Sequence, residues 1–187
     1  TATISRNGDL VSSMYVEADM DRNALTATIG YANWTNNTGH ALIESVEVEI
    51  GGQRIDKHYG QFLDIYNELT DHDESEWIGL NKHSAKDAYL TSGSNADAGA
   101  AQTTKLFVPL KFWFNRNPGL ALPLIALQYH EVKVKLSTRA LSNLVNGDGT
   151  VVAPTTAPTV NLWVDYIYLD TDERRRFAQQ SHEYLIE

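Results

Sequence analysis

Histidine followed by glutamate occurs twice in the chain, and proteins use this pair of residue types for zinc binding and for acid–base catalysis. The zinc motif HExxH places two imidazoles on one face of a helix, but in HEYLIE the position of the second histidine is Ile186. In YHEV, His130 and Glu131 begin a predicted strand and point to its opposite faces. Neither pair predicts a catalytic dyad or a metal site.

Other patterns that could do chemistry are also incomplete. The acidic run DHDESE, residues 71–76, offers oxygen ligands for a hard cation but lacks the glycine and spacing of a calcium loop, so we interpret it as a solvated turn. We expect four scattered histidines to lie in exposed turns: His40, His58, His72 and His83. The sequence has no GxSxG elbow and no HxH pair of the cupin type. We therefore predict a protein that is not an enzyme, with no catalytic residue, metal ligand or cofactor.

The charge balance argues against nucleic acid as a direct partner. The 187 residues include 24 acidic and 15 basic side chains, which gives a net charge of −9 that repels phosphate backbones. The one dense basic run, residues 174–176, follows three acidic residues, and we predict a solvated turn there. The chain has no cysteine, which excludes disulfides and thiolate metal sites.

Two short matches to the glycosylation pattern N-x-[ST] begin at Asn33 and Asn36. They fall in a segment that we expect to be an exposed loop. Because such short patterns arise often by chance, unmodified surface asparagines are an equal alternative.

Hydrophobic residues recur along most of the chain with a period of two, which predicts an all-β fold. Strands are expected over residues 10–20, 41–50, 105–114, 129–137 and 160–170, and HEYLIE is expected to begin one more. A short helix is predicted for GQFLDIYNELT, in which Phe62, Ile65, Tyr66 and Leu69 recur at helical spacing. Residues 91–104 and 143–159 are predicted to be exposed loops. This order of strands favours a two-sheet sandwich.

The stretch VEVEIGGQRIDKHYG predicts a hairpin rather than a phosphate-binding loop. Gly51 and Gly52 tolerate the positive φ of a two-residue turn, and neither GxGxxG nor GxxxxGK[ST] is present. The expected register pairs Ile50 with Gln53, then residue 49 with 54 and residue 48 with 55. One step further Glu47 would face Asp56, so we expect the pairing to loosen there.

The segment NRNPGLALPLIALQYH is too apolar for a solvated loop. Its five large aliphatic side chains need cover from the interior of the sandwich or from a neighbouring subunit, and the interior is the favoured choice. These side chains are Leu120, Leu122, Leu124, Ile125 and Leu127.

Four segments together resemble the major capsid protein of the nucleocytoplasmic large DNA viruses. They are ISRNGDLVSSMYVE, VEVEIGGQRIDKHYG, LFVPLKFWFNRNPGLALPLIALQYHEVKVKL and LWVDYIYLDTDERRRFAQQSHEYLIE. The similarity covers nearly the whole chain except for segments 21–39, 71–104 and 141–159. It implies an antiparallel two-sheet jelly-roll sandwich with one short helix and long loops.

The resemblance also implies an architecture and a set of partners. Family members have two consecutive jelly rolls, and three subunits form a nearly hexagonal capsomer of an icosahedral shell over an internal membrane. Residues 1–187 are then expected to be one domain, the first jelly roll without its first and last strands. Other copies of the protein, minor capsid proteins and surface glycans are the expected partners, and the virion is the expected location.

Two other classes of protein stay open at this stage. A carbohydrate-binding jelly roll would use Trp34, Trp77 or Tyr89 in loops as stacking platforms. A cupin-like metalloenzyme is the third class, and the missing HxH pair disfavours it.

Overall fold

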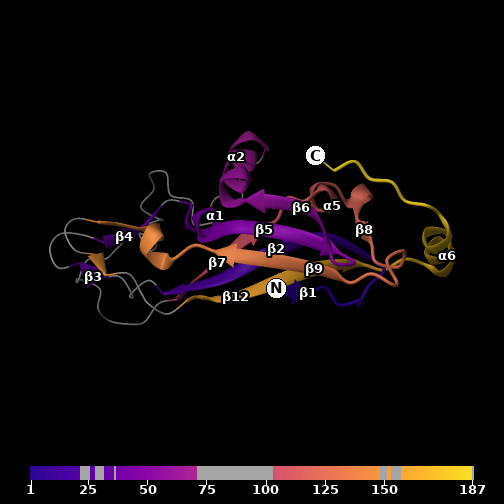
Figure 1. The fold of residues 1–187 in the computed structure, drawn as a ribbon, viewed down its shortest axis with the longest axis horizontal. Helices are drawn as coiled ribbons and strands as arrows, with labels where there is room; N and C mark the ends of the chain where they lie inside the picture. The colour runs from indigo at the N-terminus through magenta and orange to yellow at the C-terminus, as the bar shows by residue number, and fades with distance from the viewer. Residues whose placement is uncertain are drawn as a thin grey trace.

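The computed structural model of the chain describes residues 1–21, 26–27, 32–35, 37–70, 103–147, 151–152 and 157–186. Within these ranges, two four-stranded antiparallel sheets lie face to face around the hydrophobic core (Figure 1). The first sheet has the order β1–β9–β5–β6, with bounds β1 Ala2–Thr3, β9 Val132–Thr138, β5 Ile43–Ile50 and β6 Gln53–Tyr59. The second has the order β12–β2–β7, with β8 also paired to β2; the bounds are β12 Thr159–Ile167, β2 Leu10–Asp21, β7 Thr103–Pro109 and β8 Leu122–Pro123. The predicted all-β two-sheet sandwich is confirmed.

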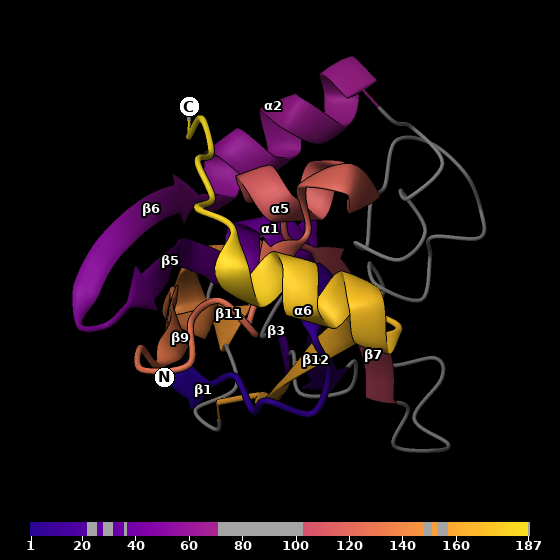
Figure 2. The same cartoon turned by 90° about the vertical axis from the view of Figure 1, so that its right-hand side faces the viewer.

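Short elements complete the described part of the chain. Two small two-stranded sheets pair β10 Val145–Gly147 with β4 Ala32–Trp34 and β11 Val151–Val152 with β3 Thr26–Ala27. The α-helices are α1 Thr38–Leu42, α2 Gly60–Thr70, α5 Trp113–Arg116 and α6 Thr171–Gln179, and the 3-10 turns are Pro118–Leu120 and Leu141–Leu144. Strands β3 and β4 lie at the end of the molecule opposite α6 (Figure 1). Seen from the α6 end, the N-terminus lies beside β1 and β9, and the C-terminus lies on the side of α2 (Figure 2).

The period of two positions the core as predicted. In β2, Met14 and Val16 are buried between the sheets, and in β5, Val46 and Val48 face them. Their polar neighbours point to the outer faces of the sheets because successive side chains alternate along a strand. A second buried cluster lies near α1 and contains Ala18, Met20, Trp34, Leu42, Leu106 and Leu144.

The connection between β5 and β6 is a two-residue turn in which Gly51 and Gly52 have φ of +60° and +84°. The first two predicted pairs, residues 50–53 and 49–54, are present, but the third is wrong. A bulge at Ile55 places Val48 opposite Asp56 and Glu47 opposite Lys57. The extra residue therefore replaces an unfavourable acid–acid pair with an ion pair, in which Glu47 Oε1 lies 2.8 Å from Lys57 Nζ.

Gly60 joins β6 to α2 at a point where the backbones are in contact. A Cβ at this position would lie 2.1 Å from the carbonyl oxygen of His40 and 2.3 Å from that of Ile43. Only glycine fits such a close approach of main chains. The start of α2 is thereby packed directly against the junction of α1 and β5.

Helical turns replace one end of each of two predicted strands. The strand predicted to begin at residue 41 begins at Ile43, because residues 38–42 form α1. The strand predicted to run to residue 114 ends at Pro109, which fits the position of β7 at the edge of its sheet. A helical turn then directs Trp113 and Phe114 into the core together, which the alternation of a strand would not allow.

The basic run and the C-terminal segment also differ from expectation. Residues 174–176 belong to α6 rather than to a turn, and HEYLIE forms no strand within the described residues. Asp170 caps α6 by accepting a hydrogen bond from the Glu173 N–H at 2.8 Å. Tyr184 then packs against the main core, so the segment after α6 is held by side chains and not by a strand ladder.

The predicted loop 143–159 contains β10 and β11, whose backbones are paired with β4 and β3. Thr103 and Thr104, at the end of the other predicted loop, belong to β7. Residues 91–102 lie outside the described residues. Among the described residues, four α-helices are present where one was expected.

Candidate assembly surfaces

The outer face of the second sheet has a row of three aromatic side chains, which we call the aromatic face. Tyr15 of β2 lies between Trp163 of β12 and Phe107 of β7. Its ring centroid is 6.3 Å from that of Trp163, with the planes nearly parallel, and 6.1 Å from that of Phe107, edge to face. Trp163 is 51% exposed, so this row is a partly open apolar surface.

Glu17, two residues after Tyr15 on the same face of β2, orients Trp163 within the aromatic face. Its Oε1 accepts a hydrogen bond from Lys105 Nζ at 2.7 Å, and its Oε2 accepts one from Trp163 Nε1 at 2.6 Å. The hydrogen bond from Lys105, followed by that from Trp163, lowers the pKa of Glu17 below its ordinary value, and the same ion pair raises the pKa of Lys105. The indole orientation is therefore set by a carboxylate that stays ionised.

The outer face of the first sheet is charged, and we call it the charged face. Acidic side chains of β5 alternate across the strands with basic side chains of β6 and β9. Glu47 pairs with Lys57, Glu49 pairs with Lys135, and Lys133 Nζ lies 3.0 Å from Glu131 Oε2. The hydrogen bond from Lys57 lowers the pKa of Glu47 and raises the pKa of Lys57. Each exposed pair contributes little to stability, but together they give a hydrophilic face.

Asp9 anchors α6 to the start of β2. Its Oδ2 accepts hydrogen bonds from the Leu169 N–H at 2.8 Å and from Arg174 Nη2 at 2.9 Å. These two bonds, the backbone one first, lower the pKa of the Asp9 carboxyl. Arg174, the first residue of the basic run, is thus held by a structural ion pair.

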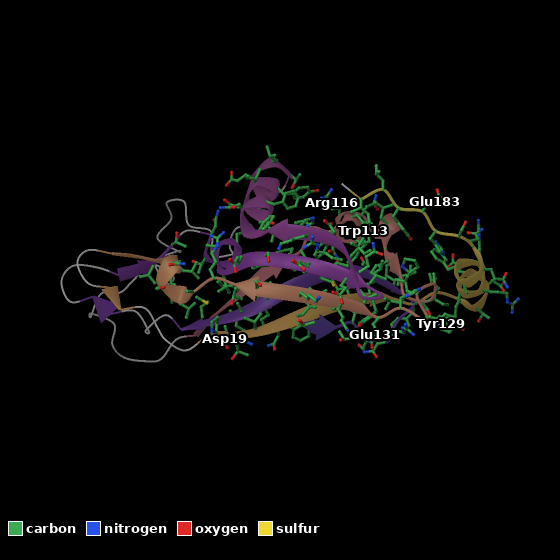
Figure 3. All side chains as sticks on the ribbon, in the orientation of Figure 1. Asp19, Trp113, Arg116, Tyr129, Glu131 and Glu183 are labelled. Atoms are coloured by element: carbon green, nitrogen blue, oxygen red, sulfur yellow. The ribbon has the colours of Figure 1, made fainter. Side chains whose placement is uncertain are left out.

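Further exposed apolar side chains include a group at α2 and the single residue Tyr129. Tyr59, Ile65 and Leu69 lie on or next to α2, with exposed fractions of 52%, 60% and 79%. The predicted helix is confirmed, but Leu63 rather than Ile65 or Leu69 is buried beneath it. Tyr129, 93% exposed, lies toward the α6 end (Figure 3).

The apolar segment after α5 is buried in part, as predicted. Leu122 and Leu124 are inside the core, and Leu127 packs against it. Leu120 is exposed, so the prediction of interior cover is wrong for this residue.

Several residues singled out from the sequence lie elsewhere than expected. His40 and His58 are buried rather than exposed; His40 Nδ1 lies 3.3 Å from Asp64 Oδ1, and the His58 ring lies between Phe62 and Phe112. The histidines at positions 72 and 83 and the acidic run 71–76 lie outside the described residues. His130 is exposed beside Gly51, and Glu131 pairs with a lysine, so the two form no dyad.

Of the three candidate sugar-contacting residues, the structure describes one, Trp34. Trp34 is buried at the end of β4, where it cannot serve as a stacking platform. Trp77 and Tyr89 lie outside the described residues. The backbone of Asn33 belongs to β4 and not to a loop, while its side chain and all of Asn36 lie outside the description.

The described residues give no group of three or more His, Asp or Glu side chains placed to hold a metal ion. In the same part of the chain, no helix has both the length and the apolar character needed to cross a membrane.

Sequence reasoning missed Asp9, Glu17, Trp163 and the helix that contains Arg174. A signal existed for the helix, because Asp170 followed three residues later by Glu173 matches a capping box. The contacts of Glu17 and Asp9 join residues that are 146 and 165 positions apart, which no local pattern reveals.

Comparison with known proteins decides the family. A family model described as "Major capsid protein N-terminus" matches residues 1–170. The chain belongs to this capsid protein family. Over 192 residues it is 50% identical to the major capsid protein of Pyramimonas orientalis virus, covering 100% of this chain and 44% of that protein. It is 43% identical to the major capsid protein of Paramecium bursaria Chlorella virus 1, covering 98% of this chain and 39% of that protein.

Solved structures agree with this assignment. The chain superposes on a subunit of the quasi-atomic PBCV-1 virus capsid with a TM-score of 0.70 and 40% identity, covering 98% of this chain and 41% of that one. The Faustovirus major capsid protein, 13% identical with a TM-score of 0.59, shares the fold. The sandwich of this capsid family member is therefore a capsid jelly roll, and the family is structural rather than enzymatic. The chain spans less than half the length of the two viral relatives named above.

Proposed function

We propose that the chain is the N-terminal jelly roll of a major capsid protein that builds the shell of a large DNA virus. The observation that carries this proposal is the family match over residues 1–170 combined with the superposition on a virus capsid subunit. The protein acts by self-association and is located in the virion, after assembly in the host cell.

The domain assignment is part of the proposal. Residues 1–187 form a single jelly-roll domain that lacks the first and last strands of that jelly roll, and a second jelly roll completes the subunit. This is supported by the edge position of β12, a nine-residue strand that pairs only with β2 within the described residues. A long unpaired edge of this kind normally receives another strand or is covered.

Three such subunits form a trimeric capsomer with a nearly hexagonal outline, and capsomers tile an icosahedral shell. Minor capsid proteins and surface glycans are further partners, and the candidate attachment sites for glycans are Asn33 of β4 and Asn36. The aromatic face and the exposed apolar side chains on α2 supply surface of the kind that subunit interfaces bury. Direct contact with nucleic acid is not part of this function, because the net charge is −9 and Arg174 is engaged by Asp9.

The test is the mass of the full-length protein in solution, by mass photometry and analytical ultracentrifugation. We expect a trimer that persists at low concentration. Leu69→Glu, Tyr129→Glu and Trp163→Glu, introduced singly, identify the interface: at least one is expected to release folded monomers, because a charge buried in an apolar contact is costly. Arg54→Glu on the charged face is the matched control and leaves the trimer intact. A full-length protein that stays monomeric at high concentration contradicts the proposal.

A further inference from the structure

Two polar side chains are buried where α2 packs against α1, β5 and β6. His58 comes from the end of β6, and Asn67 comes from α2 itself. Within the described residues, no hydrogen bond is formed by either nitrogen of the His58 ring or by Asn67 Oδ1. Buried polar groups without partners are rare in folded proteins, and each one costs stability. The packing beneath α2 is therefore incompletely satisfied.

The His58 ring is held between two phenyl rings, and we call this arrangement the ring slot. The ring centroid lies 4.6 Å from that of Phe62, in α2, and 4.7 Å from that of Phe112, directly before α5. Phe112 is fully buried in the core of the sandwich. One wall of the ring slot thus belongs to the sandwich, and the other belongs to α2.

The surroundings of the ring slot disfavour a proton on His58. Asp56 Oδ2, 3.1 Å from Nε2, is the carboxylate that would attract the charge, but Nδ1 would become an N–H donor without an acceptor. Arg116 of α5 adds positive charge: its guanidinium lies over the rings of Phe62 and Tyr66, beside α2 (Figure 3). The residue of β5 opposite His58 is apolar. A charge buried there is costly, so the ring slot is built for a neutral imidazole.

α2 has few apolar contacts to hold it. Leu63 is its one fully buried hydrophobic side chain, while Ile65 and Leu69 are exposed. Separating α2 from the sandwich therefore exposes much less apolar surface than separating the two sheets. Regions with few buried apolar contacts open at lower free energy than the core of a protein.

We propose that α2 is a pH-sensitive element of the sandwich: protonation of His58 opens the ring slot and releases the helix beyond Gly60, while the two sheets stay folded. In the released state water surrounds the imidazole, so this state binds a proton near the ordinary pKa of 6.5, whereas burial lowers the pKa of His58 in the packed state. Acid therefore shifts the equilibrium toward release as the pH falls below 6.5. This inference goes beyond shell assembly and does not depend on trimer formation.

A second histidine beneath α2 acts in the opposite direction. His40 Nδ1 lies 3.3 Å from Asp64 Oδ1, so a proton on His40 would strengthen its attraction to α2. The side chain of Asp64 is 40% exposed, and solvent screens this pair. The side chain of His58 is only 6% exposed, so we expect its effect to be the larger of the two.

The test is amide hydrogen exchange of the full-length protein at pH 7.5 and pH 5.5, with each rate divided by that of an unstructured peptide at the same pH. Ile65 and Tyr66 report release of α2, because an isolated helix of this length loses its hydrogen bonds. Val48, in the centre of the first sheet, reports unfolding of the sandwich. We expect the two α2 amides to be at least about tenfold less protected than Val48 at both pH values.

Between pH 7.5 and pH 5.5 the protection of the α2 amides is expected to fall several-fold, up to about tenfold, which is the change in protonation of a free imidazole. His58→Phe fills the ring slot with a group that takes no proton and is expected to abolish this fall. His58→Leu also lacks a titratable group and covers the case in which the phenyl ring does not fit. His130→Gln removes an imidazole outside the ring slot, and we expect it to keep the fall.

Each other outcome overturns the proposal. An equal fall in the wild type and in both His58 variants assigns the effect to another group. Protection of α2 that equals that of Val48 means that the helix opens only when the whole sandwich unfolds. Protection that rises in acid gives control of α2 to the pair of His40 and Asp64. The mass of the protein is measured at both pH values, so a change in assembly is seen separately.

Discussion

At the scale of single residues, Arg174 shows how a basic run can be structural. Three arginines follow one another in α6, but only the first reaches Asp9 among the contacts described. We predict that Arg174→Gln lowers the free energy of unfolding by about 1 kcal/mol, because Asp9 loses a charged hydrogen bond. Chemical denaturation followed by far-UV circular dichroism measures the change.

Arg175→Gln is the matched control for this prediction, since it removes the same charge from an exposed position of the same helix. Equal destabilisation by both variants would contradict the role of Arg174. The pH dependence has a definite sign: the pKa of Asp9 is lowered, so its contribution is complete above its ordinary pKa of 3.8 and is lost as the pH falls through the lowered value. The difference between the two variants therefore disappears in acid.

His58 gives a second dependence on pH, which has the same sign as that of Asp9 but begins at a higher pH. Burial is the main cause that lowers its pKa below the ordinary 6.5, and repulsion from Arg116 adds to it, while Asp56, with Oδ2 3.1 Å from Nε2, opposes it. The unfolded chain takes up a proton near pH 6.5, but the folded chain does so only at lower pH, so stability falls as the pH drops below 6.5. We predict that His58→Phe flattens this part of the stability curve.

Thermal unfolding at a series of pH values measures the effect of His58→Phe. The phenyl ring keeps the packing against Phe62 and Phe112, so the variant tests the charge rather than the shape. His130→Gln, at an exposed histidine, is the control that removes an imidazole outside the core. A slope below pH 6.5 that is the same in the wild type and in His58→Phe would refute the assignment.

At the scale of elements, the β5–β6 hairpin allows two destabilising effects of a side chain in a turn to be measured separately. One is the backbone strain of a positive φ, and the other is a steric clash. Gly52 has open space around the position of a Cβ, whereas a Cβ on Gly51 would lie 2.6 Å from His130 Nδ1. We predict that Gly52→Ala costs about 1 kcal/mol, the price of positive φ, and that Gly51→Ala costs more because the clash adds to it. Denaturant unfolding of both variants measures the difference.

A double-mutant cycle isolates the steric part of this difference. Adding His130→Ala to Gly51→Ala removes the imidazole that the new methyl group meets, so the cost should fall toward that of Gly52→Ala. If the cost of Gly51→Ala does not change in the absence of the imidazole, backbone strain alone accounts for it.

The same hairpin shows what sequence alone can and cannot predict. The turn and its first two pairs follow from local rules, since two glycines and alternating side chains define them. The bulge at Ile55 was not predicted, because local rules for a two-residue turn give a regular ladder. The bulge becomes favourable only when the partners of Glu47 are compared, since it replaces Asp56 by Lys57. Likewise, the aromatic residues of α5 have high β propensity and predict a strand, but Phe112, Trp113 and Phe114 are all buried on one side. Tertiary packing overrode the local preference in both cases.

At the scale of the whole molecule, the two outer faces of the sandwich differ in chemistry. The charged face is covered by paired acidic and basic side chains, and the aromatic face leaves Trp163 half exposed. The period of two predicted which residues point outward, but not which outer face is apolar, because that depends on the order β12–β2–β7. In the trimer test proposed above, we therefore expect Trp163→Glu to have a larger effect than Arg54→Glu.

Gly60 has a consequence for how capsid proteins of this kind diverge. The main chains of α1, β5 and α2 are in contact at Gly60 and leave no room for a methyl group. The N-terminal end of α2 is therefore held in place by backbone packing. Insertions or deletions after Thr70 would begin at the C-terminal end of α2, which is the end opposite Gly60. We therefore expect changes of length after Thr70 to leave the packing of the start of α2 against α1 and β5 unaltered.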